Sequence, residues 1–169
     1  MGYLKNNDYD DTAVRHFVKK IFESDFNIKL KDGKYKKIDL VCEDNPHMGV
    51  EVERGGWEGD FWSNEKYCMI TKSGFPTINI PQRKEHYWKD INGGKKNLSA
   101  LNNIFVRTNR DFSQFIIVRP EVIRDLKKMV RTMFIPSNNK NKSYEEFMSF
   151  RREDTETYNL VNEKFILEE

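Results

Sequence analysis

The sequence predicts an α/β fold in which a mixed β-sheet is flanked by helices. Apolar residues recur at helical spacing in one early segment, and three short segments with strand character follow it. A helix-length segment then precedes a fourth strand, so an antiparallel meander should lead through a crossover helix into a parallel strand. The predicted order is helix, three strands, helix and strand, at residues 10–24, 26–31, 35–42, 48–53, 60–72 and 77–80.

The first helix and its following turn carry clear end signals. Asp10 or Asp11 can cap the helix, because a carboxylate at this position accepts hydrogen bonds from the first backbone N–H groups. The apolar stripe after the cap comprises Val14, Phe17, Val18, Ile21 and Phe22. The pair Asp32-Gly33 favours a tight hairpin turn between the first two strands.

The second half of the chain extends this core. Strands are expected at 103–108 and 114–119, and helices at 121–134 and 143–152. The prediction is therefore a single domain over residues 1–169, with a core at about 10–119 and a C-terminal helical extension at about 120–169. The stretch from Arg124 to Lys142 is basic, and it fits either a phosphate-binding patch or a solvated helix face.

Composition excludes several classes of protein. The chain has 169 residues, of which 37% are hydrophobic and 33% charged, as in globular proteins. No apolar run is long enough to span a membrane, and no export signal is seen at the N-terminus, so a cytoplasmic location is expected. Two cysteines and three histidines show no zinc-site spacing, and Cys42 and Cys68 are expected to be buried thiols.

Three carboxylates are the main candidate for chemistry. Glu51 and Glu53 alternate with Val50 and Val52, so both acids lie on one face of the predicted strand. Asp39 interrupts the apolar segment before them, and a hairpin connection would bring it beside Glu51. Such acids repel one another unless a divalent cation binds them. The alternative is a half-exposed amphipathic strand.

The pattern of these acids resembles that of the PD-(D/E)XK nuclease superfamily, since eleven residues separate Asp39 from Glu51-Val52-Glu53. The resemblance implies a restriction-endonuclease-like αβββαβ core, DNA as partner, a homodimer, and Mg²⁺ or Mn²⁺ held by Asp39 and Glu51. Glu53 stands where the family usually has lysine, and Lys66 in the next predicted helix is a candidate substitute. The resemblance also implies that Glu23 is an additional acidic metal ligand.

Basic and aromatic residues alternate after the predicted fourth strand. Arg83 and Lys84 precede His86-Tyr87-Trp88, a mixture that suits a phosphate backbone and unstacked bases. Arg107 occupies a similar polar strand end. The alternative for the first segment is a surface loop whose aromatic side chains pack on the core.

These patterns predict a metal-dependent deoxyribonuclease. The catalytic candidates are Asp39, Glu51, Glu53 and Lys66, and the DNA-binding candidates are Arg83, Lys84 and Arg107. The alternative is a catalytically inactive protein of the same fold that binds DNA or a protein partner. A third interpretation is an interaction subunit that has no role with nucleic acids.

Overall fold

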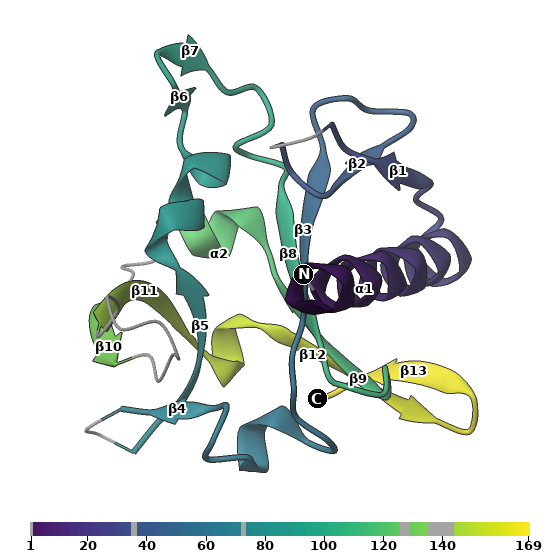
Figure 1. Cartoon of the computed structure of the whole chain (residues 1–169), viewed down its shortest axis with the longest axis vertical. Coiled ribbons are helices and arrows are strands. Elements are labelled where there is room, and N and C mark those ends of the chain that lie inside the picture. Colours follow the sequence, from purple (N-terminus) through teal and green to yellow (C-terminus); the bar gives the residue numbers. More distant parts are fainter. Residues whose placement is uncertain (1, 35–36, 72–73, 126–128, 135–143) are drawn as a thin grey trace.

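A long helix and two β-sheets account for most of the computed structural model of this protein (Figure 1). The structure describes residues 2–34, 37–71, 74–125, 129–134 and 144–169. The α-helices and 3₁₀ helices are α1 (Gly2–Phe26), α2 (Pro120–Asp125), η1 (Phe61–Ser63), η2 (Gln82–Trp88) and η3 (Arg152–Asp154). None of the helices described here has the length and apolar character that crossing a membrane requires.

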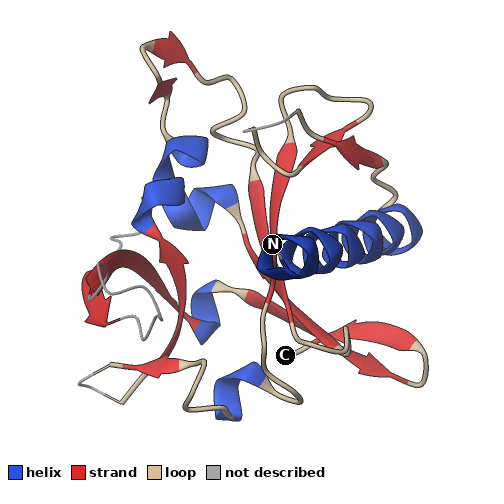
Figure 2. Ribbon diagram, in the orientation of Figure 1, coloured by secondary structure: helices blue, strands red, loops and turns tan. Residues whose placement is uncertain are grey.

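Strands predominate over helices in the described chain, as the ribbon colours in Figure 2 make clear. In chain order the strands are β1 (Leu30–Asp32), β2 (Leu40–Cys42), β3 (Gly49–Arg54), β4 (Met69–Ile70), β5 (Pro76–Pro81), β6 (Ile91–Asn92), β7 (Lys95–Lys96), β8 (Ile104–Thr108), β9 (Gln114–Val118), β10 (Met129–Phe134), β11 (Tyr144–Arg151), β12 (Glu156–Val161) and β13 (Lys164–Leu167).

The main sheet has the order β1-β2-β3-β8-β9-β12-β13. Strands β3 and β8 are parallel, with Val50 opposite Ile104, and every other neighbouring pair in this sheet is antiparallel. The sheet is therefore mixed, and the overall structure belongs to the predicted α/β class. A second sheet has the order β10-β11-β5-β4, and β6 and β7 form a separate hairpin.

Helix α1 covers one face of the main sheet (Figure 1). Its buried residues Val14, Val18 and Phe22 belong to the same apolar cluster as Val50 and Val52 of β3. The predicted helix and its apolar stripe are thus confirmed, but the expected cap at Asp10 or Asp11 is wrong, because α1 begins at Gly2 and both residues lie within it. Because side chains alternate along a strand, Glu51 and Glu53 lie on the opposite face.

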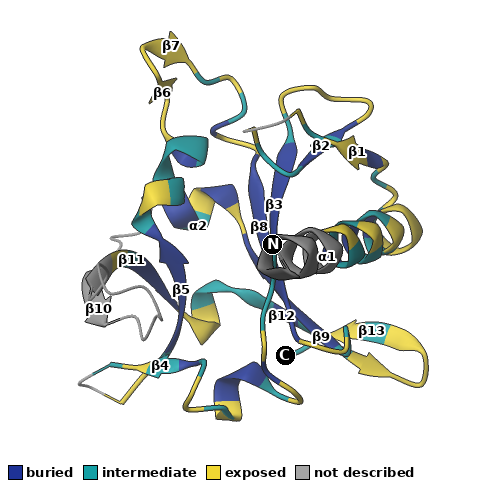
Figure 3. Cartoon of the chain, in the orientation of Figure 1, coloured by how far each residue is buried: buried dark blue, intermediate teal, exposed yellow. Residues whose placement is uncertain are grey.

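That opposite face is covered by the second sheet and its connections. Ile78 and Ile80 of β5 share an apolar cluster with Phe105 of β8 and Ile116 of β9. Figure 3 shows that β3, β5 and β8 are mostly buried along their lengths. The alternative interpretation of β3 as a half-exposed strand is therefore wrong, since both of its faces are covered.

The predicted crossover helix at 60–72 is wrong. Only Phe61–Ser63 forms a helical turn, and the chain then proceeds to the short strand β4. Phe61 and Trp62 are both buried in the apolar cluster that contains Ile78 and Ile80 of β5. The strand at 77–80 exists as β5, but it pairs antiparallel with β11 in the second sheet. The parallel neighbour of β3 is instead β8, so the last two elements of the expected αβββαβ order are not seen.

The predicted C-terminal helical extension is also wrong. Helix α2 ends at Asp125, and the segments expected to continue it and to form a last helix contain strands β10 and β11. Strands β12 and β13 complete the main sheet, because β12 pairs with β9. The strands expected at 103–108 and 114–119 are confirmed as β8 and β9. Most cations of the basic stretch after Arg124 lie outside the described residues or have undescribed side chains.

The first strands are shorter than predicted. The pairing of β1 with β2 covers only Leu30 to Asp32 and Leu40 to Cys42, so these strands are not joined by the two-residue hairpin predicted at Asp32-Gly33. Asp39 closes the connection between these strands, and its backbone carbonyl accepts a hydrogen bond from the Gly33 N–H at 2.8 Å. Cys42 and Cys68 are buried free thiols, as expected.

Candidate functional site

Asp39 and Glu51 meet where β2 begins beside β3. The Val52 N–H donates to Asp39 Oδ2 at 3.0 Å, and the Asp39 N–H lies 3.4 Å from Glu51 Oε1. Strand β2 starts only at Leu40, so the Asp39 carboxylate accepts the Val52 N–H hydrogen bond that a backbone carbonyl of a longer strand would have accepted. The predicted proximity of Asp39 and Glu51 is thereby confirmed.

Glu51 is buried between the two sheets, with 5% of its surface exposed. Burial is the main reason that its pKa rises from 4.5 to about 8, because a carboxylate loses hydration there. A hydrogen bond with Asp39 and the negative charge of Asp39 raise the pKa further, whereas Lys84 opposes the rise. A positive ligand at Glu51 would therefore be favoured.

Lys84 provides the nearest cation to Glu51. Its Nζ lies 3.2 Å from Glu51 Oε2 and 3.9 Å from Glu53 Oε2, and its side chain is only 17% exposed. Lys84 belongs to η2, which directly follows β5 and so crosses the face of the main sheet that carries these acids. Tyr87 lies in the same helix. Burial, together with the negative charges of Glu51 and Asp39, raises the pKa of Tyr87 to about 12.

Glu53 pairs mainly with Arg107. Arg107 Nε lies 3.1 Å from Glu53 Oε1, and Arg107 Nη2 donates to the carbonyl of Asn79 at 2.7 Å. Burial opposes ionisation of Glu53, but the charges of Arg107, Lys84 and Arg83 outweigh it and hold its pKa below the usual value. Glu53 is therefore a firmly ionised partner of Arg107, a role that the sequence pattern did not indicate.

Arg15 of α1 contacts the Asp39 carboxylate. Arg15 Nη2 lies 3.3 Å from Asp39 Oδ1. Glu23, the additional ligand implied by the resemblance, is exposed on the same helix. It lies eight residues after Arg15, which corresponds to about 12 Å along a helix axis. The structure thus brings Arg15, and not Glu23, to Asp39.

Lys66 and Arg83 lie at the margin of this cluster. Lys66 is exposed, with its Nζ 5.5 Å from the centre of the Tyr67 ring. It lines a cavity of about 390 Å³ together with Glu53 and Arg107, but the cation beside Glu51 is Lys84. Arg83 is exposed on η2, and its charge acts on Glu53 and Tyr87.

Each acid of the cluster therefore has a basic partner: Arg15 for Asp39, Lys84 for Glu51 and Arg107 for Glu53. No group of three or more histidine, cysteine, aspartate or glutamate side chains suited to a metal ion occurs among the described residues. A metal here would have two carboxylate ligands at most, with Glu53 engaged by Arg107.

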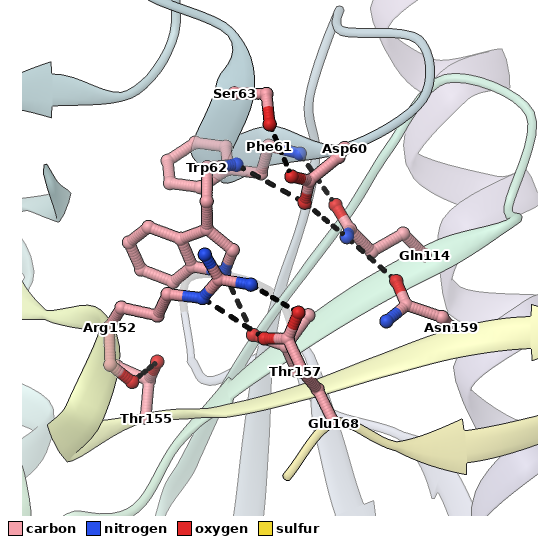
Figure 4. A network of polar contacts seen from close by, with 10 residues as sticks. All are labelled: Asp60, Phe61, Trp62, Ser63, Gln114, Arg152, Thr155, Thr157, Asn159 and Glu168. Atoms are coloured by element: carbon pink, nitrogen blue, oxygen red, sulfur yellow. Dashed lines mark hydrogen bonds and ion pairs between the residues drawn. The ribbon is translucent and has the colours of Figure 1, made fainter.

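A second polar cluster lies elsewhere between the sheets, around Gln114 (Figure 4). Gln114 Oε1 accepts from Trp57 Nε1 at 3.2 Å and from the Phe61 N–H at 2.8 Å. Its Nε2 donates to Asp60 at 2.9 Å and to Asn159 at 2.8 Å. One buried amide thus connects η1, β9 and β12.

Comparisons with known proteins add no family assignment. A scan against protein-family models finds no match, and a search of curated proteins finds no significant relative.

Proposed function

We propose that this protein is a metal-dependent nuclease that hydrolyses phosphodiester bonds in DNA. The observation that supports this proposal is the meeting of two carboxylates, Asp39 and Glu51, with the ammonium group of Lys84. A pair of acids beside a lysine is the arrangement of the nuclease superfamily that the sequence resembles. Here the lysine comes from η2, because the usual lysine position holds Glu53.

Asp39 and Glu51 would hold the metal. Mg²⁺ takes oxygen ligands and is often bound by one or two carboxylates, with waters and phosphate oxygens completing its coordination. The donor set fits, since a divalent cation would favour the charged form of the buried Glu51, whose pKa is raised. When bound, such a cation supplies an activated water and stabilises charge on a phosphate.

The remaining residues position the substrate. The ammonium of Lys84 lies at the pair of acids and would donate to a phosphate oxygen, where negative charge builds during hydrolysis. Arg107 is fixed between Glu53 and the Asn79 carbonyl, so it keeps Glu53 from competing for Lys84. Arg15 holds the Asp39 carboxylate from the helix side.

A second candidate function is supported by the charge balance of the site. Every acid is already paired with a cation, which is also the arrangement of a catalytically inactive protein stabilised by ion pairs. Such a protein would bind DNA or a protein partner through the basic residues of η2 without cleaving it.

Cleavage assays separate the two candidates. Plasmid, single-stranded and branched DNA are incubated with Mg²⁺, Mn²⁺ or EDTA, and products are resolved on gels. We expect metal-dependent cleavage, and a rate at least about 100-fold lower for Asp39→Asn, Glu51→Gln and Lys84→Met, since each removes a charge at the reacting phosphate.

Glu23→Gln is the matched control, because it makes the same chemical change at an exposed position of α1. It should cleave at the wild-type rate. Cleavage that persists in EDTA or in Asp39→Asn would contradict the proposal. Retention of DNA without cleavage of any substrate would favour the second candidate.

A further inference from the structure

A groove adjoins Glu53 where the chain leaves β3 toward η1. It consists of two hollows of about 390 Å³ and 350 Å³, which share Arg54, Gly55, Gly56 and Tyr67 as lining residues. Glu53 lines the first hollow, and its Oε2 lies 3.9 Å from the Nζ of Lys84, which pairs with Glu51. We refer to the two hollows together as the β3 groove.

The charge of the β3 groove is positive. Four cations line it, namely Arg54, Lys66, Arg107 and Arg110, against the single carboxylate Glu53. Arg107 is occupied by Glu53, but Lys66 is exposed and the side chain of Arg110 is 67% exposed, with Glu58 3.7 Å away. The exposed cations are available to a polyanion that passes along the groove.

The backbone between the two hollows is bare. A Cβ atom on Gly55 would come within 2.0 Å of the Trp57 ring, and one on Gly56 within 2.8 Å of the Tyr67 hydroxyl. Neither glycine has room for a side chain beside these aromatic groups. Both positions are therefore glycine because the Trp57 ring and the Tyr67 hydroxyl occupy the space that a Cβ would need.

The groove also has apolar surface between its cations. Tyr67, Met69 and Phe147 line it and are partly exposed. A DNA duplex presents its phosphates outward and keeps its bases stacked, so it gains little from such a surface. An unstacked base gains both from apolar contact and from stacking on an aromatic ring.

We infer that the β3 groove binds a single DNA strand, with its phosphates at Lys66 and Arg110 and a base on Tyr67. The substrate would therefore be single-stranded DNA or a single-stranded segment of a branched molecule. This inference rests on the proposed function for the assignment of the strand as substrate. Binding to the groove can nevertheless be measured without cleavage.

The test is fluorescence anisotropy with a labelled oligothymidylate and a duplex of equal length, in EDTA. We expect the full chain to bind the single strand at least about tenfold more tightly than the duplex. Combined Lys66→Glu and Arg110→Glu substitutions should weaken single-strand binding at least tenfold. Neutral Lys66→Gln should lower the salt dependence of binding by about 0.7 in log K per log salt, the value for one lost phosphate contact.

Two further variants make the test specific. Tyr67→Leu keeps apolar volume but removes the ring, and should weaken binding roughly fivefold or more. Lys164→Glu is the matched control, because Lys164 is exposed on β13 outside the β3 groove, and it should bind as the wild type does. Thermal unfolding of each variant separates lost binding from lost folding.

The outcomes also separate this inference from the proposed function. Wild-type binding in the charge-reversed and Tyr67→Leu variants, or equal affinity for duplex, would overturn the inference even if the protein cleaves DNA. Loss of binding in these variants would support it even if the wild type cleaves nothing.

Discussion

The polar cluster around Gln114 and the polar cluster around Glu51 differ in the kind of groups that interact within them. Around Gln114, neutral amides and backbone groups satisfy one another, and the carboxylate bonded to Gln114, Asp60, receives hydrogen bonds. Around Glu51, three carboxylates face three cations, and burial keeps the pKa of Glu51 near 8. The first arrangement connects structural elements, whereas the second contains a carboxyl group, Glu51, whose ionisation is unfavourable unless a positive ligand binds it.

The pKa values of Asp60 and Glu51 shift in opposite directions. Partial burial opposes its ionisation, but hydrogen bonds from Gln114 and Ser63 and from the Trp62 N–H hold its pKa below the usual value. Asp60 is therefore stabilised as an anion, while Glu51 is destabilised as one. This is the difference that the proposed function predicts between a structural carboxylate and a metal-binding one.

The largest effect should come from removing the centre of the structural cluster. Gln114→Ala leaves Trp57 Nε1 and the Phe61 N–H without an acceptor inside the protein. An unsatisfied buried donor costs about 1–3 kcal/mol, so we expect a loss of about 3 kcal/mol in the free energy of unfolding, measured with urea. Gln82→Ala, at a half-buried position, should cost less than about 1 kcal/mol. Equal costs for Gln114→Ala and Gln82→Ala would remove the basis for calling the Gln114 cluster structural.

A divalent cation should produce the next largest effect, and only at the cluster around Glu51. Binding to the native state alone adds about 2.7 kcal/mol of stability at a concentration of 100 times the dissociation constant. We expect Mg²⁺ or Mn²⁺ to raise the melting temperature of the wild type and of Gln114→Ala alike. Asp39→Asn should lose this response. A metal response that survives in Asp39→Asn would place the metal elsewhere.

A third effect should appear in the pH dependence of stability in EDTA. The folded state holds the Glu51 proton up to a pKa of about 8, whereas the unfolded state releases it near 4.5. The unfolded state therefore binds fewer protons in this window, and the free energy of unfolding falls as pH rises from about 4.5 to 8, by at most about 1.4 kcal/mol per unit. The contribution is full below this window and lost above it.

Glu51→Gln isolates that effect, because it keeps the shape of the side chain and removes its titration. The free energy of unfolding should depend less on pH in this variant, and at pH 8 the variant should be more stable than the wild type. Urea unfolding at several pH values between 5 and 8 measures both. Parallel curves for the two proteins would show that Glu51 ionises as freely in the folded state as in the unfolded one.

Features that depend on nearby residues could be predicted from the sequence. The first helix, strands β8 and β9, and the meeting of Asp39 with Glu51 all follow from local periodicity or from a short connection. Lys84 was recognised as a candidate for phosphate binding, since it follows a strand among aromatic residues. Its contact with Glu51 was not predicted, because it depends on β5 crossing to the other face of the main sheet.

The errors arose where a segment has a distant partner. Strand β11 was predicted as a helix, although it pairs with β5 across a wide separation, with Phe147 opposite Pro81. The segment at 60–72 has apolar residues at helical spacing, but Phe61 and Trp62 are buried by β9 and β12 residues, including Thr157, which accepts from Trp62 Nε1 at 2.9 Å. The sequence around a segment does not indicate which distant strand will pair with it or cover it. Arg15 was missed because an exposed cation on a helix is common.

The parallel pairing of β3 with β8 has a consequence for how the chain folds. The segment between these strands contains β5 and η2, and β5 needs β11, which ends at Arg151, to complete its sheet. Contacts of such long sequence separation form slowly, because the loop must be closed before the contact is made. During synthesis Asp39 and Glu51 can therefore come together early, while Lys84 reaches them only after most of the chain has left the ribosome.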